Sequence, residues 1–396
     1  MTSLEKRMVL MNALFNIVFT LFLSFVSVFL YAYTKSFVVM SLFVVCRVGV
    51  FPIMFRLANI ITTKKPYAFC MGIGIVLIVF SLLFAITQTK LFIKNGYYSL
   101  VVALIAGIGF GLYWFGSNTL YQIIPTDDSR ANFLSYYYTF NSAAALVAPF
   151  ISDIIISLSA NDIVGYRNVL IFIIIVGIVV LFFATKLNVK AQEKPYSLIE
   201  CLKLKDPIYK NTMLGIFFYA MKDSLTLSIT SILVSNAAGS GNLYSRLLIV
   251  FSAISIFLCR YLTKLCKPKN LKISLLLTSI NSILSTLVLA LWPNMFGAIF
   301  FGITNAISTA LYQGEYNYLI GQSIQRYQDD ISGRVTAKET YTTLGRSVAM
   351  FFVVACYFLL PENIYLKFSV SLISFTPIMV IYFFNKVIDE LNQTRN

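Results

Sequence analysis

Long runs of apolar residues, each bounded by charged or turn residues, constrain this chain more than any other feature. An α-helix needs about 20 consecutive apolar residues to cross the hydrocarbon core of a bilayer. The runs are too continuous for the strands of a β-barrel, whose residues alternate between apolar and polar. Hydropathy predicts twelve spans in the 396 residues, at 8–33, 37–61, 67–87, 97–124, 131–158, 166–186, 211–236, 243–265, 272–292, 295–322, 335–359 and 364–385.

The composition agrees with a membrane protein and excludes several other classes. Hydrophobic residues make up 58% of the chain and charged residues 12%, whereas a soluble domain carries about 25% charged residues. Because so few charges cannot cover a water-facing surface, a soluble enzyme, a disordered protein and a secreted disulfide scaffold are excluded. The predicted fold class is therefore an all-α integral membrane protein with twelve transmembrane helices.

The net charge of +15 arises from 31 Lys and Arg residues against 16 Asp and Glu residues. In a soluble chain this excess would suggest nucleic acid, but in a membrane protein Lys and Arg mark the cytoplasmic loops. With both termini inside, 22 of the 31 cations fall in cytoplasmic segments, six in outer segments and three within spans. We therefore expect a multi-pass protein with both termini in the cytoplasm and no nucleic-acid partner.

The sequence offers no pattern for metal or cofactor chemistry. It contains no histidine, which removes the commonest metal ligand and the commonest general base. Its six cysteines are scattered, without the spacing of a metal site or of a disulfide framework. We therefore expect no metal, no cofactor and no enzyme activity.

Two pairs of arginines indicate an internal repeat. Arg56 follows the second span and Arg260 follows the eighth, 204 residues later. Arg130 precedes the fifth span and Arg334 precedes the eleventh, again 204 residues later. Matches in the same order at one offset indicate a duplicated six-helix unit. We predict an N-terminal six-helix bundle over 1–186, a cytoplasmic linker with a short interfacial helix over 187–210, and a C-terminal six-helix bundle over 211–396.

The loop after the second span carries Leu57-Ala58-Asn59 and then Lys64-Lys65. With the two six-helix halves and the linker, this loop resembles the signature of the major facilitator superfamily, which has an aspartate where Asn59 stands. The resemblance covers essentially the whole chain. It implies a pseudo-symmetric transporter whose central cavity opens alternately to the two sides of the membrane. The positions then expected to take part in conformational gating are Arg56, Asn59, Arg130, Arg260 and Arg334.

Five charged residues interrupt the apolar spans: Arg47, Lys222, Asp223, Glu315 and Arg346. Counted from the nearest cytoplasmic cations at 1.5 Å per residue, they lie about 14–18 Å from the inner boundary of a roughly 30 Å core. None lies on spans three, six, nine or twelve, which the resemblance places outside the cavity. Because an isolated charge at this depth costs at least about 2.5 kcal/mol, we expect the five to share a polar environment.

These charges allow a structural and a functional interpretation. They can form buried ion pairs that hold the helices together. Alternatively, a carboxyl group that is neutral when buried and charged beside a cation suits proton coupling, for which Glu315 and Asp223 are the candidates. The cations Arg47, Lys222 and Arg346 suit an anionic substrate group. Further candidate substrate contacts are aromatic and amide side chains, namely Trp114, Asn118, Tyr137, Asn141, Tyr219, Gln313, Tyr316 and Asn317.

The predicted function is a secondary active transporter of the bacterial cytoplasmic (inner) membrane, driven by protons through alternating access. We expect it to export an anionic or amphipathic organic molecule, which includes lipid-linked molecules. Two alternatives stay open, an uptake permease for an anionic metabolite and a facilitator-like sensor or immunity protein that does not transport. The expected partners are the small-molecule substrate, protons and the lipid bilayer, and the protein is expected to be a monomer.

Overall fold

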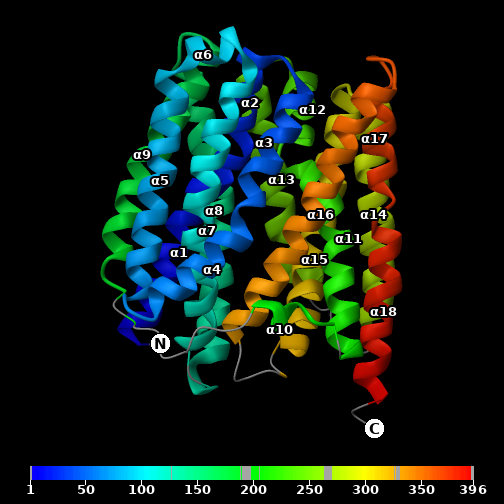
Figure 1. Ribbon diagram of the computed structural model, residues 1–396. Helices are drawn as coiled ribbons and strands as arrows, with labels where there is room; N and C mark the ends of the chain where they lie inside the picture. Colours follow the sequence, from blue (N-terminus) through cyan, green and yellow to red (C-terminus); the bar gives the residue numbers. More distant parts are fainter. Residues whose placement is uncertain are drawn as a thin grey trace. The chain divides into compact units, whose positions relative to one another are not determined.

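The computed structural model describes residues 2–125, 127–187, 189, 198–204, 206–262, 270–324, 326 and 331–393. Within these ranges it does not describe the side chains of residues 122, 127–132, 134, 135, 138, 198, 199, 258–262, 310, 313, 314, 317 and 331. The chain divides into two compact units, unit 1 over Met1–Leu198 and unit 2 over Ile199–Asn396. Every regular element in the described residues is a helix (Figure 1).

Unit 1 begins with a long helix that changes its pitch in the middle of the predicted first span. Its elements are α1 (Ser3–Leu21), the π-helical η1 (Phe22–Val26), α2 (Ser27–Thr34), α3 (Phe37–Gly49), α4 (Phe51–Thr62), α5 (Tyr67–Thr87), α6 (Thr89–Lys94), the 3₁₀ turn η2 (Gly96–Tyr98), α7 (Ser99–Ile123), α8 (Asp127–Ser157) and α9 (Asp162–Ala184). Within this unit, α5 packs between α7 and α9, and α1 packs against α8 and α9.

Unit 2 begins with a short helix in the linker. Its elements are α10 (Leu198–Leu202), α11 (Pro207–Thr226), α12 (Ile229–Ala238), α13 (Gly241–Leu262), α14 (Leu271–Leu291), α15 (Met295–Ile324), α16 (Ile331–Leu359), α17 (Tyr365–Ser374) and α18 (Pro377–Gln393). Here α11 packs against α16 and α18, while α15 packs against α13 and α14.

Local sequence explains where several helices begin and break. Asp206 caps α11 by accepting a hydrogen bond from the backbone N–H of Tyr209 at 3.0 Å, and Pro207 occupies the first helical position, where its missing N–H costs nothing. Two other prolines start a helix after a break within a predicted span, Pro52 in the first turn of α4 and Pro377 at the start of α18. These breaks divide a span without ending it.

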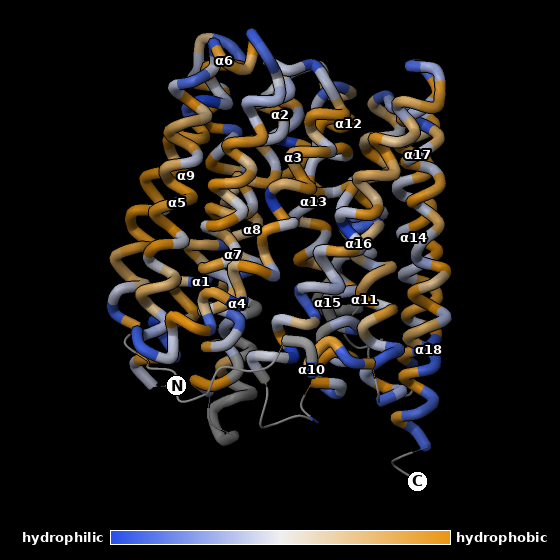
Figure 2. Tube along the Cα trace, in the orientation of Figure 1, coloured by the Kyte–Doolittle hydropathy of each residue, from blue (hydrophilic) through white to orange (hydrophobic). Residues whose placement is uncertain are grey.

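The helices carry a lipid-type surface outside a packed core. Figure 2 shows continuous hydrophobic colour along α5 and α9 of unit 1. Large apolar side chains stay exposed on both helices, among them Phe80, Ile175 and Phe182. In water such a surface would aggregate, whereas in a bilayer it faces lipid at no cost.

The predicted fold class is confirmed. In the described residues, ten helical stretches are long and apolar enough to cross a membrane. Two shorter apolar stretches, Gly241–Phe257 and Met295–Thr309, lie in α13 and α15 at the positions of the remaining two predicted spans. The molecule is a multi-pass helical membrane protein.

Candidate functional site

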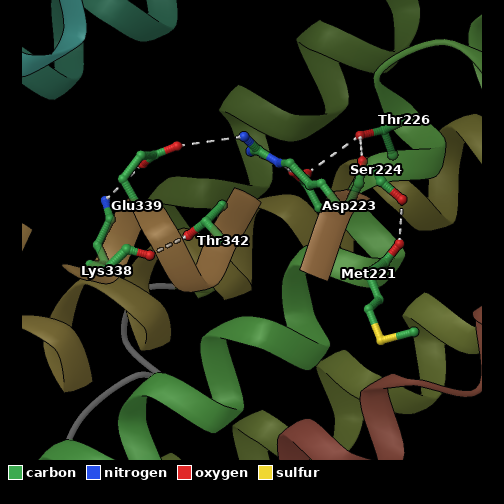
Figure 3. Close-up of polar contacts among 8 residues, drawn as sticks. Met221, Asp223, Ser224, Thr226, Lys338, Glu339 and Thr342 are labelled. Atoms are coloured by element: carbon green, nitrogen blue, oxygen red, sulfur yellow. Dashed lines mark hydrogen bonds and ion pairs between the residues drawn. The ribbon is translucent and has the colours of Figure 1, made fainter. Parts of the chain in front are cut away.

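A charged network joins α11 and α16 in unit 2. The Arg346 guanidinium donates to Asp223 Oδ2 from Nη2 at 2.8 Å and from Nε at 3.2 Å. On its other side, Arg346 Nη1 lies 3.9 Å from Glu339 Oε1, and Lys338 Nζ lies 3.9 Å from Glu339 Oε2. Figure 3 shows Lys338, Glu339 and Asp223 along this chain of contacts, with Thr226 beside Asp223. The predicted proximity of Asp223 and Arg346 is therefore present in the structure.

Close packing of α11 and α16 brings this network together. A Cβ atom added at Gly345 would lie 2.1 Å from the Phe217 carbonyl oxygen, so only glycine lets the two backbones approach this closely. Arg346 follows Gly345 directly, and its charged group reaches Asp223 on the facing helix. The side chains of Arg346 and Asp223 stay 19% and 24% exposed, so water or a ligand can reach the pair.

Lys222 lies beside this network and is held by an amide. It is 5% exposed, and its Nζ donates to Asn305 Oδ1 on α15 at 3.0 Å. Three aromatic side chains line the same helix pair, because the Tyr219 ring on α11 lies 5.0 Å from the rings of both Tyr312 and Tyr316 on α15. Lys222, Lys338 and Arg346 outnumber Asp223 and Glu339, which leaves one surplus positive charge.

Glu315 differs from the prediction, because it faces α14 instead of the Asp223 network. Its Oε1 accepts hydrogen bonds from Ser274 Oγ and, at 3.0 Å, from Thr278 Oγ1. The residue is fully buried, and its Oε2 has no hydrogen-bond partner among the residues that the structure describes. In the part of the chain that the structure describes, no Lys or Arg lies within ion-pair distance of this carboxyl group.

Glu315 also lies nearer to one end of its bundle than the residue count predicts. Ser274 is two residues and Thr278 six residues beyond Lys272, which pairs with Asp389 at that end of α14 and α18. At 1.5 Å per residue this places the carboxyl group about 3–9 Å from Lys272 along the helix. Counting back from Arg326 gives a greater depth because α15 continues as a helix to Ile324, beyond the start of α14.

Arg47, the fifth buried charge, belongs to α3 of unit 1. It is 3% exposed, and its guanidinium carbon lies 5.7 Å from the ring centroids of both Phe22 and Phe43. Phe22 opens the π-helical segment η1, so the change of helix pitch and the buried cation lie together. The two rings provide cation–π contacts in an apolar environment.

Unit 1 also holds the predicted amide and aromatic residues of α7 and α8. Trp114 and Asn118 are half-buried and lie four residues apart on one face of α7. Tyr137 and Asn141 have the same spacing on α8, and the Tyr137 ring lies 4.9 Å from Tyr121 of α7. The Asn16 side chain of α1 donates to the Asn141 carbonyl oxygen at 2.8 Å. These residues form one face across three helices.

The residues predicted to take part in conformational gating differ from one another in their surroundings. Arg334 Nη1 donates to the Cys201 carbonyl oxygen of α10 at 3.3 Å, and its guanidinium lies 4.7 Å from the Tyr209 ring. Asn59 is 3% exposed, and its Oδ1 has no hydrogen-bond partner within the described part of the chain, whereas Arg56 is half-buried. The side chains of Arg130, Arg260, Gln313 and Asn317 lie outside the described residues.

Several residues around these groups escape sequence reasoning. Glu339 next to Lys338 has the pattern of an exposed surface pair, and Asn305 carries no charge to attract attention. Ser274, Thr278 and Ser282 recur every four residues along α14 and are all buried. Residues at this spacing form a polar stripe along one side of an otherwise apolar helix. This stripe is the sequence feature from which the partners of Glu315 could have been predicted.

The two six-helix units and their helix order define the class of the fold, which is that of the major facilitator superfamily of membrane transporters. The predicted resemblance is confirmed at this level. A mutant form of the nucleoside transporter NupG aligns over 97% of this chain and 100% of its own, with 12% identity and a TM-score of 0.73. A D-xylose–proton symporter aligns over 96% of both chains, with 13% identity and a TM-score of 0.72.

A bacterial homologue of the human lysosomal transporter Spinster aligns over 97% of this chain and 96% of its own, with 15% identity and a TM-score of 0.69. No family model matches the chain. In sequence, the chain is 22% identical over 367 residues to uncharacterized protein YqgE of Bacillus subtilis (strain 168), covering 91% of this chain and 84% of that protein. These neighbours establish the fold and leave the substrate open.

Proposed function

We propose that the protein is a secondary active transporter that works by alternating access and exports an anionic or amphipathic organic molecule in exchange for protons. The observation that carries this proposal is the set of ionic side chains within the spans of unit 2, of which Lys222 and Glu315 are buried and Asp223 and Arg346 are partly exposed. A charge inside a membrane protein is costly and is typically retained for substrate or ion movement.

The substrate charge follows from the network on α11 and α16. Asp223 and Glu339 compensate two of the three neighbouring cations, so a carboxylate or phosphate on the substrate neutralises the remainder. The Arg346 guanidinium suits such a group because its planar set of donors binds two oxygens at once. An entering anion would also compete with Asp223 for Arg346, which gives Asp223 a role in proton coupling.

The coupling ion follows from Glu315. Within the described residues its carboxyl group has two hydroxyl donors and no cation, and a buried charge without a counter-ion is unstable in a low-dielectric interior. Glu315 therefore holds a proton in this conformation. When α14 and α15 move and admit water, the same group can ionise and release that proton.

The experiment is proton flux in liposomes of defined orientation that contain a pH-sensitive dye. Citrate, glucose 6-phosphate, uridine monophosphate and cholate are first screened for thermal stabilisation of the purified protein. A stabilising anion should then move protons across the liposome membrane, and the direction of the pH change distinguishes export from uptake. Glu315→Gln should keep the thermal stabilisation and lose the proton flux by tenfold or more.

Asp389→Asn provides the matched control, because Asp389 is an exposed carboxylate in the same unit. It should transport as the unmodified protein does. Undiminished proton flux in Glu315→Gln would exclude Glu315 as the coupling group. An anion that stabilises the protein but moves neither itself nor protons would instead favour a sensor.

A further inference from the structure

An open pocket of about 500 Å³ lies where α11 begins and α18 ends, at the end of unit 2 that the distribution of Lys and Arg predicts to be cytoplasmic. Its polar lining comprises Lys210 and Asn211 of α11 and Lys386, Asp389 and Glu390 of α18, two helices that pack against each other. The volume is within the usual range of small-molecule sites, about 300–1,000 Å³. None of the five residues belongs to the charged network on α11 and α16, so the pocket is a separate polar site of unit 2.

Two lysines of this pocket have no carboxylate within ion-pair distance among the described residues. Lys210 is exposed, and its side chain makes no hydrogen bond there. Lys386 Nζ donates to the neutral Tyr382 hydroxyl at 2.7 Å and lies 4.3 Å from the centroid of the Tyr382 ring. Because neither ammonium group is held by an anion in this part of the chain, both are available to bind a phosphate.

Glu390 adds a charge of the opposite sign to the pocket. Its Oε1 accepts a hydrogen bond from Asn211 Nδ2 at 3.3 Å, whereas its Oε2 is buried and has no partner in the described part of the chain. A buried carboxylate oxygen without a donor costs free energy, and a ligand ammonium group in the pocket would provide that donor. The other carboxylate of the lining, Asp389, is paired with Lys272. The groups left for a ligand are therefore two cations and one anion.

One side of α18 leads from lipid-type residues to this pocket. Ile378 and Met379 are exposed apolar side chains, and Tyr382 follows about one turn later. Lys386 and Glu390 come next at intervals of four residues, which keeps them on the same side of the helix. Tyrosine and lysine at the end of a span are typical of the level of the lipid headgroups, and Figure 2 shows α18 becoming hydrophilic toward its C-terminal end. A phospholipid whose acyl chain lies along Ile378 and Met379 would present its headgroup to the pocket.

We propose that this pocket of α11 and α18 binds the headgroup of a membrane phospholipid that carries a phosphate and a primary ammonium group, as phosphatidylethanolamine does. Lys210 and Lys386 bind the phosphate, and Glu390 accepts hydrogen bonds from the ammonium group. A choline headgroup has no N–H to donate, and a glycerol headgroup has no positive charge for Glu390. The site lies on the surface of unit 2, and the proposal does not depend on transport.

The test is native mass spectrometry of the purified protein in detergent with equal amounts of phosphatidylethanolamine, phosphatidylcholine and phosphatidylglycerol that have the same acyl chains. The protein should retain phosphatidylethanolamine about tenfold more than phosphatidylcholine, because only the former donates hydrogen bonds to Glu390. Lys210→Gln combined with Lys386→Gln should lower the retention of phosphatidylethanolamine and phosphatidylglycerol by about tenfold. Glu390→Gln should abolish the preference for ethanolamine over choline and leave the retention of phosphatidylglycerol unchanged or higher.

Lys367→Gln is the matched control, because Lys367 is an exposed lysine of α17 outside the pocket lining. It should retain the three lipids as the unmodified protein does. Because the lipids are compared within each variant, the measured preference does not depend on how stable that variant is.

Three results would overturn the proposal. They are equal retention of the three lipids by the unmodified protein, an unchanged preference for ethanolamine in Glu390→Gln, and undiminished retention in the double lysine variant. Displacement of the lipid by an equal concentration of soluble glycerophosphoethanolamine would overturn the assignment to a membrane lipid, because the acyl chain along α18 would then contribute nothing to binding.

Discussion

Asp223 and Arg346 are 123 residues apart in the chain, and two guanidinium nitrogens of Arg346 donate to a single Asp223 oxygen. Both groups lie within membrane-spanning helices and both stay partly exposed. Among the described residues, the Thr226 hydroxyl is the one group that engages Asp223 Oδ1, at 3.4 Å. The hydrogen bonds of this pair connect α11 to α16. The partial exposure of both side chains leaves the pair accessible to water or a ligand.

Removing one partner of this pair should destabilise unit 2. Asp223→Asn leaves Arg346 with the more distant Glu339, and we expect a loss of about 1–3 kcal/mol, less than for a fully buried pair because water reaches both groups. The measurement is thermal or denaturant unfolding in detergent. Asp389→Asn, which breaks the exposed pair with Lys272, should cost less than about 1 kcal/mol. Equal losses of stability in the two variants would contradict a stabilising contact between Asp223 and Arg346.

Gly345 should tolerate no side chain. Gly345→Ala places a methyl group 2.1 Å from a backbone oxygen of α11, so the helices must separate, at an expected cost of about 1–3 kcal/mol. Gly321→Ala is the control in α15, where an added Cβ meets nothing within 4 Å. That change should raise stability by about 0.5–1 kcal/mol because alanine favours the helix. Melting temperatures that shift in the same direction would disprove the close approach of α11 and α16.

The hydroxyl groups of α14 should support ionisation of Glu315. Ser274→Ala combined with Thr278→Val removes both hydroxyl donors to Glu315 Oε1, and hydrogen bonds to a charged group contribute about 1.5–3 kcal/mol each. Proton release during the transport cycle should slow by tenfold or more, with ligand binding retained. Ser285→Ala removes a buried hydroxyl that donates to the Ser282 carbonyl within α14, and it should leave the rate unchanged. Proton flux at the parent rate in the double variant would show that Glu315 does not depend on α14.

Arg334 should hold the short linker helix α10. Arg334→Gln loses the contact with the Tyr209 ring and weakens the hydrogen bond to the Cys201 carbonyl oxygen. Hydrogen exchange over residues 198–204 should then become faster, while exchange in the core of α11 stays slow. Lys203→Gln removes an exposed pair with Glu200 and should change exchange much less. Slow exchange in Arg334→Gln would show that α10 is held by other contacts.

Most of the architecture can be predicted from the sequence, because whether a segment inserts into the membrane depends mainly on its own composition. Spans at 67–87 and 97–124 correspond to α5 and α7 within a few residues, since the free energy of transferring each segment depends mainly on its own side chains. The breaks at Val50 and between Thr226 and Ile229 are less visible. They divide spans whose hydropathy stays continuous, so the spacing of apolar residues does not report them.

By itself, the sequence predicted a chain that crosses the membrane with twelve helices, carries the facilitator type of fold and places a small number of charges within its spans. Only the tertiary structure decided which charges meet. Successive residues are about 100° apart around a helix, so a small rotation of α15 decides whether Glu315 faces α11 or α14. Hydropathy does not predict this rotation. It is set by close contacts between distant segments, such as Gly345 against Phe217. Those contacts pair Asp223 with Arg346 and leave Glu315 among the hydroxyl groups of α14.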